Sequence, residues 1–306
     1  MTPRAFQQVD VFTDTAFLGN PLAVVLDGEG LSDAQMQAFA AWTQLSETTF
    51  VLPPTPEGVA GGADYRVRIF TPGAELPFAG HPTLGTAHTW LSAGGKPRQS
   101  GQLVQECGVG LVALTSTDGR WAFAAPNLQR QTPAPAQLAE VLAALGLHAD
   151  EVLAAQDLNN GPHWLGLLID SVDTLLALAP DHAALKRLNT KVGVAAQRAS
   201  SAGSLIRRAN REARAFSPSA APADPTDLEV RAFAAPVGIA EDPVTGSLNA
   251  SLAQWLMAEG HMPKRYSARQ GTVLGRAGQV FLSQDDSGQV WVGGDVVACI
   301  QGQVTL

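Results

Sequence analysis

The chain has 306 residues, of which 45% are hydrophobic and 16% charged, and its formal net charge is −8. This composition excludes a disordered chain and is typical of a globular protein, while the length favours two domains of about 150 residues each. The acidic balance argues against nucleic acid or an anionic membrane as a partner.

The sequence also carries expectations about cellular location. No apolar run approaches the length of a membrane span, and the first residues lack the apolar core of a secretory signal. We therefore expect a cytoplasmic protein with no membrane partner. Cys107 and Cys299 lie far apart in the sequence and are expected to be free thiols, as is usual in that compartment.

Strands and helices alternate along the chain. Hydrophobic periodicity predicts strands at 6–12, 21–26, 48–52, 65–69 and 228–232, a hairpin across 103–114 and 121–124, and helices at 32–44, 84–91, 136–147, 170–188 and 248–256. Ser32 and Gln35 form the pattern of a capping box, which marks the start of the first helix. The polar, Pro-rich segment 127–137 is the best candidate for a linker.

One strand–loop–helix pattern occurs twice. The stretch FTPGAELPFAGHPTLG at 70–85 resembles FAAPVGIAEDPVTG at 233–246, and each follows a predicted strand and precedes a predicted helix. Phe70 and Phe233 are 163 positions apart, whereas His81 and Asp242 are 161 apart, which predicts a second loop two residues shorter. Two such units indicate a duplicated architecture with two similar lobes.

The repeat places His81 and Asp242 immediately before the two related helices. A helix start offers unpaired backbone N–H groups and the positive end of the helix dipole, which suit a carboxylate or phosphate. If the lobes face each other, both helix starts and both side chains converge on one cleft. The alternative is that Asp242 is an ordinary helix cap and His81 a loop histidine with satisfied hydrogen bonds.

Glu47 lies between an apolar helix and a strand rich in Thr, Phe and Val. A carboxyl in such a place is partly desolvated, which raises its pKa and suits it to general acid or base catalysis. A solvated glutamate at the end of a strand is the competing interpretation.

Other catalytic motifs do not occur. The chain has no nucleotide phosphate loop, no HExxH zinc motif and no Gly-x-Ser-x-Gly, and Gly108-Val109-Gly110 lacks the rest of a dinucleotide fingerprint. His81 and His88 could share a helix face, but no third metal ligand is near them in sequence. We therefore expect neither a metal nor a cofactor, and acid–base chemistry is the most economical enzymatic hypothesis.

Several motifs together resemble the phenazine-biosynthesis PhzF-like family. They are GNP at 19–21, LSETTF at 45–50, FTP at 70–72 with AGHPTL at 79–84, and GIAEDPVTGS at 238–247. The resemblance covers essentially the whole chain. It implies an α+β fold related to diaminopimelate epimerase, in which two similar lobes each wrap a curved, mostly antiparallel sheet around a central helix.

The resemblance also implies the site. Its catalytic residues fall on Glu47, His81 and Asp242, and its ligand-binding positions fall on Asn20, Ser46, Gly80, Gly246 and Ser247. The epimerase relatives use two cysteines at the helix starts, and this chain has none there, so a two-thiol racemase is not expected. Lobes of 1–128 and 129–306 are expected, with 298–306 returning to the first, and a homodimer is expected by analogy.

The implied activity is a cofactor-independent isomerase that moves a proton between carbons of a small carboxylate, such as dihydro-hydroxyanthranilate. Two alternatives remain open: an epimerase or racemase of an amino or hydroxy acid, and a non-catalytic protein that binds small anions. The Arg- and Pro-rich stretch 202–227 matches no motif. If it borders the cleft, we expect a substrate other than dihydro-hydroxyanthranilate.

Overall fold

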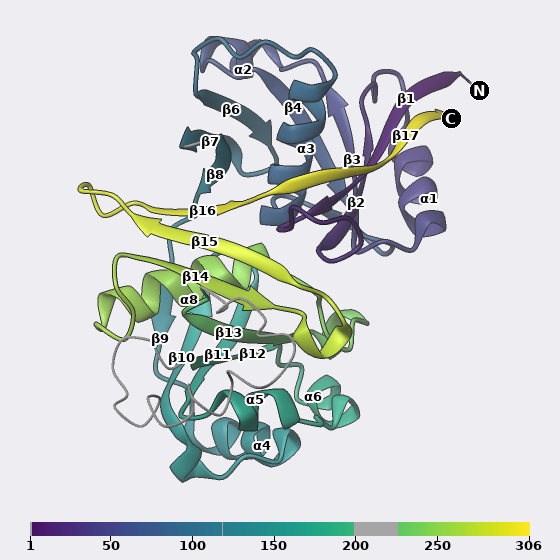
Figure 1. Cartoon of the computed structure of the whole chain (residues 1–306). Helices are drawn as coiled ribbons and strands as arrows, with labels where there is room; N and C mark the ends of the chain where they lie inside the picture. Colours follow the sequence, from purple (N-terminus) through teal and green to yellow (C-terminus); the bar gives the residue numbers. More distant parts are fainter. Residues whose placement is uncertain (1, 118, 199–225) are drawn as a thin grey trace, which may run out of the picture.

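The computed structural model describes residues 2–117, 119–198 and 226–306 (Figure 1). Almost all of the Arg- and Pro-rich stretch 202–227, and with it any role at the cleft, lies outside these described residues. Figure 1 shows two lobes, with the strands at the end of the chain running between them.

The N-terminal lobe begins with strands and contains a central helix, α3. In chain order its elements are β1 (Pro3–Val11), β2 (Asn20–Val25), α1 (Asp33–Thr43), β3 (Glu47–Leu52), α2 (Pro56–Ala60), β4 (Tyr65–Phe70), β5 (Glu75–Leu76), α3 (Gly80–Ser92), β6 (Gln102–Cys107), β7 (Gly110–Thr117) and β8 (Arg120–Ala124). Ser32 caps α1 with the predicted capping box, and Gln44 ends this helix in the left-handed conformation.

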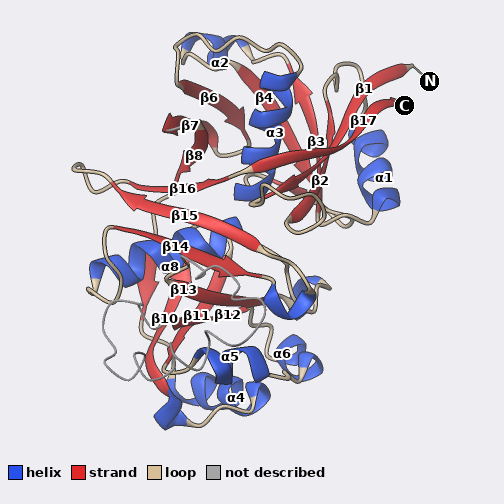
Figure 2. Cartoon of the chain, in the orientation of Figure 1, coloured by secondary structure: helices blue, strands red, loops and turns tan. Residues whose placement is uncertain are grey.

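The C-terminal lobe has a comparable set of elements around α8. They are β9 (Gln129–Gln131), α4 (Pro135–Leu145), η1 (Ala149–Glu151), β10 (Val152–Asn159), β11 (His163–Ile169), α5 (Val172–Ala177), α6 (His182–Arg187), β12 (Val192–Gln197), β13 (Leu228–Phe233), η2 (Ala235–Val237), α8 (Gly246–Ala258), β14 (Arg265–Gln270), η3 (Thr272–Leu274), β15 (Gly278–Gln284) and β16 (Val290–Gly294). The last strand, β17 (Val296–Thr305), follows. Figure 2 shows the helices of each lobe beside its strands.

The strand pairings follow the same order in the two lobes. From β1 through β2, β3, β4, β6 and β7 to β8 the pairs are antiparallel, parallel, antiparallel, parallel, antiparallel and antiparallel. From β10 through β11, β12, β13, β14 and β15 to β16 the sequence of senses is identical. The fold is therefore a mixed α/β arrangement in which antiparallel pairs predominate.

Two further pairings join the lobes. Strand β8 pairs antiparallel with β16, and β17 crosses back to pair antiparallel with β1. The largest cluster of buried hydrophobic side chains includes residues of both lobes, such as Val11, Phe123, Leu248 and Val292. The two lobes therefore share one continuous core at their junction.

Helix α3 lies in close contact with the strands of its lobe because its sequence is rich in small residues. A Cβ atom on Gly85 would lie 2.5 Å from Leu22 Cδ2 and 2.8 Å from Val11 Cγ2, so only glycine allows this approach. Thr86 donates a hydrogen bond of 2.9 Å to Thr49, which fixes the helix against β3. Most residues of α3 and α8 are buried.

The helix starts correct the register predicted for the repeat. Gly80 and Gly246, the first residues of α3 and α8, are 166 positions apart, whereas β4 and β13 begin 163 apart. The second loop is therefore three residues longer, not two shorter. His81 is the second residue of α3, and Asp242 lies in the loop before α8, whose capping residue is Thr245, so neither residue immediately precedes its helix as predicted.

Two other predictions were partly wrong. The expected linker contains β9, which pairs antiparallel with β10 and so belongs to the C-terminal sheet. The segment 170–188 forms two short helices, α5 and α6, where a mostly helical stretch was predicted. Leu178 adopts an extended ψ of 131°, and Pro180, which has no N–H to donate, follows it, so the helix is interrupted there.

Candidate active site

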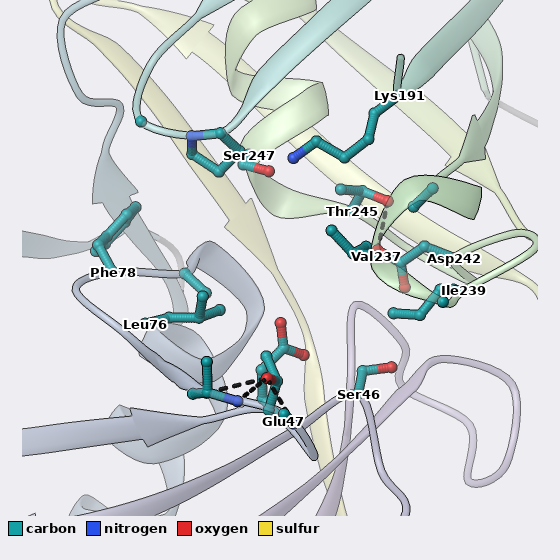
Figure 3. A pocket seen from close by; sticks show the side chains of 18 of the residues that line it. Ser46, Glu47, Leu76, Phe78, Lys191, Val237, Ile239, Asp242, Thr245 and Ser247 are labelled. Carbon is teal, nitrogen blue, oxygen red and sulfur yellow. Dashed lines mark hydrogen bonds between the residues drawn. The ribbon is translucent and has the colours of Figure 1, made fainter. Parts of the chain in front are cut away.

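A cavity of about 1030 Å³ lies between the lobes, and both lobes line it (Figure 3). Figure 3 shows Ser46, Glu47, Leu76 and Phe78 on the side of the N-terminal lobe. It also shows a facing wall from the C-terminal lobe, with Lys191, Val237, Ile239, Asp242, Thr245 and Ser247. The lining is mostly apolar with a few polar groups, as is typical of small-molecule sites.

Glu47 is placed by the end of α1. The left-handed turn at Gln44 redirects the chain, so that Ser46 and Glu47 reach the cavity at the start of β3. Only 15% of the Glu47 side chain is exposed. Burial, and to a lesser degree the charge of Asp242, raise the pKa of Glu47 to about 8. Glu47 is therefore not the solvated glutamate of the competing interpretation. Its carboxyl is mostly protonated at neutral pH.

His81 lies behind Glu47, within the first turn of α3. Its Nδ1 is 3.4 Å from Glu47 Oε2, and its side chain is 5% exposed. Burial lowers the pKa of His81 to about 3, although a hydrogen bond with the backbone of Pro21 opposes the shift. The imidazole is therefore neutral, and its contact with Glu47 is not an ion pair.

Asp242 approaches the cavity from the other lobe. Asn20 Nδ2 donates a hydrogen bond of 3.1 Å to Asp242 Oδ1, and Thr245 Oγ1 donates one of 2.6 Å to Oδ2. Burial raises the pKa of Asp242 to about 6, while these two hydrogen bonds oppose the shift. Two carboxyls with raised pKa values, from different lobes, therefore line one cavity.

The loop that carries Asp242 is held by a buried amide network that motif matching did not reveal. Gln270 Oε1 accepts hydrogen bonds from the Thr245 backbone N–H at 3.1 Å and from Asn249 Nδ2 at 2.8 Å. Gln270 Nε2 donates to the Asp242 carbonyl at 2.9 Å. Gln270-Gly271 belongs to a tail that also resembles the family, but no pattern there indicates a role for Gln270, and Asn249 lies inside an apolar helix.

The other expected binding residues divide into two groups. Ser46 and Ser247 line the cavity. Asn20 is fully buried and bonds to the Asp242 loop, also donating 2.9 Å to the Val244 carbonyl, so it positions that loop from the facing lobe. Gly80 and Gly246 lie at the junction of α3 and α8 and do not line the cavity.

The two helix starts are packed against each other. A Cβ atom on Gly246 would lie 3.1 Å from both Gly80 Cα and His81 N, which are backbone atoms that cannot move aside alone. We expect Gly246→Ala to lower the free energy of unfolding by about 1–3 kcal/mol, measured by urea unfolding. Gly302→Ala is the control, because a Cβ there meets nothing within 4 Å. Equal stability of the two variants would contradict this packing.

Lys191 also lines the cavity, and the sequence analysis did not identify it. It directly precedes β12, and its amine lies 4.8 Å from the centroid of the Trp164 ring. Burial lowers the pKa of Lys191, and Asp242 opposes the shift. A single lysine before a buried strand matches no motif, so only the folded chain places it at the site.

Within 2–117, 119–198 and 226–306, no three His, Cys, Asp or Glu side chains gather as metal ligands would. No helix in these ranges is both long enough and apolar enough to cross a bilayer.

Comparisons with known proteins agree with the geometry. A family described as phenazine biosynthesis-like protein matches residues 9–302. The chain is 32% identical over 320 residues to "Antisense-enhancing sequence 1" of Schizosaccharomyces pombe, covering 99% of each chain. It is 34% identical over 309 residues to the trans-2,3-dihydro-3-hydroxyanthranilate isomerase of Pseudomonas aeruginosa, covering 97% of this chain and 98% of that one. The fold matches the Bacillus anthracis PhzF-family crystal structure over all of both chains, with a TM-score of 0.79 and 21% identity.

Proposed function

Because this chain belongs to the phenazine biosynthesis-like protein family, we propose that it is an isomerase that moves a proton between carbons of a small carboxylate. Glu47 is the proposed general acid and base, and no cofactor takes part. The observation that carries the proposal is a cavity-facing carboxyl whose pKa is raised to about 8. The class of substrate is that of dihydro-hydroxyanthranilate, the compound named for the bacterial relatives.

The proposed reaction transfers one proton in two steps. The Glu47 carboxylate takes a proton from an sp³ carbon next to a double bond, and the C–H electron pair moves into the adjacent π system. The resulting carboxylic acid then returns the proton to another carbon of the same face. A pKa near the working pH suits one group to both steps, because neither protonation state is then strongly disfavoured.

The substrate carboxylate is proposed to bind at the start of α8 on the side of Ser247, because Gly80 and Gly246 are packed against each other and do not line the cavity. Neither Ala79 nor Thr245, the capping residues, makes a side-chain hydrogen bond to its own helix. Of the residues at these helix starts, Ser247 is the one that lines the cavity, and the positive ends of both helix dipoles favour an anion beside it.

His81, which is neutral, and Asp242 are proposed to orient the reacting groups. His81 lies 3.4 Å from Glu47 and can hold its carboxyl in one orientation. Asp242, fixed by Asn20 and Thr245, is proposed to accept hydrogen bonds from hydroxyl or amino substituents of the substrate.

A second candidate is an epimerase that uses two bases. The raised pKa values of Glu47 and Asp242, on facing walls of one cavity, are the observation that favours it. An epimerase would equilibrate stereoisomers of one compound, whereas the proposed isomerase would shift a double bond. Chiral chromatography of the products separates these two functions. A protein that binds the same acids without any solvent-proton exchange would instead be the non-catalytic anion binder.

The lobes are proposed to derive from an internal duplication. The identical order of strand senses and the paired helices α3 and α8 support this origin. We divide the chain at 1–128 and 129–306, and the pairing of β17 with β1 supports assigning 298–306 to the first lobe. The homodimer remains a prediction, to be tested by light scattering.

The proposed base predicts a pH profile for kcat/KM. The ionised form of Glu47 increases as pH rises, so the rate should increase about tenfold per pH unit below pH 8 and level off above it. Asp242→Asn removes a negative charge that raises the pKa of Glu47, so this midpoint should move to lower pH.

The control for this profile is Asp286→Asn, because Asp286 is exposed and remote from the cavity. It should leave the midpoint in place. A midpoint unchanged in Asp242→Asn would show that the two carboxyls are not coupled.

A further inference from the structure

The cavity wall opposite Glu47 carries a cation that the proposed proton transfer does not use. The backbone of Lys191 is anchored to β11, because its carbonyl accepts a hydrogen bond of 2.9 Å from the Leu165 backbone N–H. Figure 3 shows its amine pointing into the cavity that Ser247 also lines. The ring of Trp164, 4.8 Å from this amine, forms the surface on which the side chain lies.

No carboxylate among the described residues around the cavity is bonded to this cation. The other charged lining residues are the acids Glu47, Glu241 and Asp242, and Lys191 is the one basic residue that the described chain places in the lining. Glu241 forms a two-point ion pair with Arg231, with bonds of 2.9 and 2.8 Å.

The Lys191 ammonium makes neither an ion pair nor a hydrogen bond with any described residue. Asp242, the acid whose charge acts on it, is already bonded by Asn20 and Thr245. A partly desolvated ammonium without a partner costs free energy, and that cost is recovered if a ligand supplies the anion.

We infer that Lys191 binds the anionic group of the substrate and selects carboxylic acids over neutral analogues. The inference rests on the proposed function and extends it to substrate selection. Ser247 lines the same cavity, and Asn160 Nδ2 fixes the start of α8 by donating a hydrogen bond of 2.9 Å to the Ser247 carbonyl. The cavity lining also includes Phe78 and Ile239, so the apolar body of a substrate has apolar side chains to contact.

The test compares binding of matched acids and amides. Benzoate, phenylacetate and cinnamate, each beside its primary amide, are titrated calorimetrically into the full chain at pH 7. Wild type should bind at least one acid about 10- to 100-fold more tightly than its amide, the range expected of a charge-assisted hydrogen bond. Lys191→Met should remove this preference, and Lys191→Arg should retain most of it.

Methionine is chosen because it keeps the unbranched stem that lies on Trp164. Lys186→Met is the control, since Lys186 is exposed on α6 and remote from the cavity, and it should behave as wild type.

A spectroscopic readout separates binding from a purely structural role. The chain has four lysines, so ¹⁵N spectra of their amines are simple, and the signal lost in Lys191→Arg identifies Lys191. The preferred acid should raise the pKa of this amine, and its amide should not.

The inference is overturned if wild type prefers no acid over its amide, or if Lys191→Met keeps the preference. Solvent-proton exchange is measured separately. Loss of the preference in Lys191→Met without any exchange in wild type would reject the isomerase and retain the anion site, and the reverse pattern would reject only the anion site.

Discussion

Glu47→Gln is expected to lower the rate of proton transfer to substrate by about 10²- to 10⁴-fold, the usual contribution of a general acid or base. Glutamine keeps the size and the hydrogen-bonding capacity of the side chain near His81 but cannot exchange a proton. The rate is measured by NMR as the formation of the isomerised product from dihydro-hydroxyanthranilate.

The control for this variant is Glu57→Gln, in which an exposed glutamate of α2 is changed in the same way. It should keep the wild-type rate. Turnover within about threefold of wild type in Glu47→Gln would remove Glu47 from the mechanism and favour Asp242 as the base.

The same substitution is expected to stabilise the folded chain at alkaline pH. The pKa of Glu47 rises from an ordinary value of 4.5 to about 8 on folding, so the native state binds this proton more tightly than the unfolded state. Wild type therefore loses stability as the pH rises from 4.5 to 8. Glu47→Gln keeps its stability over this range, because glutamine has no proton to release. Above pH 8 the free energy of unfolding of Glu47→Gln should exceed that of wild type by about 2–5 kcal/mol.

Urea unfolding at pH 5 and pH 9 measures this effect. The difference in unfolding free energy between Glu47→Gln and wild type should be small at pH 5 and large at pH 9. Glu57→Gln should show no such change. A difference that is the same at both pH values would mean that Glu47 titrates normally in the folded state.

The loss of activity and the gain of stability that we expect for Glu47→Gln have one physical origin. A carboxyl that is removed from water near His81 is costly to ionise, and the same cost brings its pKa into the range in which it can both take and return a proton. Proteins commonly keep such unfavourable groups at functional sites.

Local patterns predicted much of the fold because local interactions determine it. The capping box at Ser32 sets the start of α1, and alternating apolar residues set β1 and β4. The partial desolvation of Glu47 was also expected from the apolar sequence around it, and its side chain is 15% exposed.

The predicted register of the repeat was wrong for a physical reason. The short GHPT and EDPVTG motifs align by their prolines and glycines, but those residues serve different purposes in the two loops. The residues that are equivalent in space are Gly80 and Gly246, because only glycines allow the helix starts to touch. This constraint comes from tertiary packing and leaves no local pattern.

Lys191 and Gln270 could not be predicted for a similar reason. Each is a single polar residue in an otherwise ordinary strand or strand edge, and its role depends on elements distant in sequence. Gln270 meets Asp242 and Thr245 only when β14 lies beside the start of α8. Lys191 reaches the cavity only because β12 lies beside β11.

The measurement that tests the central claim most directly is deuterium incorporation from solvent. Wild-type protein and Glu47→Gln are incubated in D₂O with dihydro-hydroxyanthranilate and a panel of cyclic and acyclic amino and hydroxy acids, and the products are observed by NMR. The proposed function predicts deuterium at one carbon of at least one compound with wild type, and none with Glu47→Gln. Incorporation that is equal in the two proteins would contradict the assignment of Glu47 as the proton carrier.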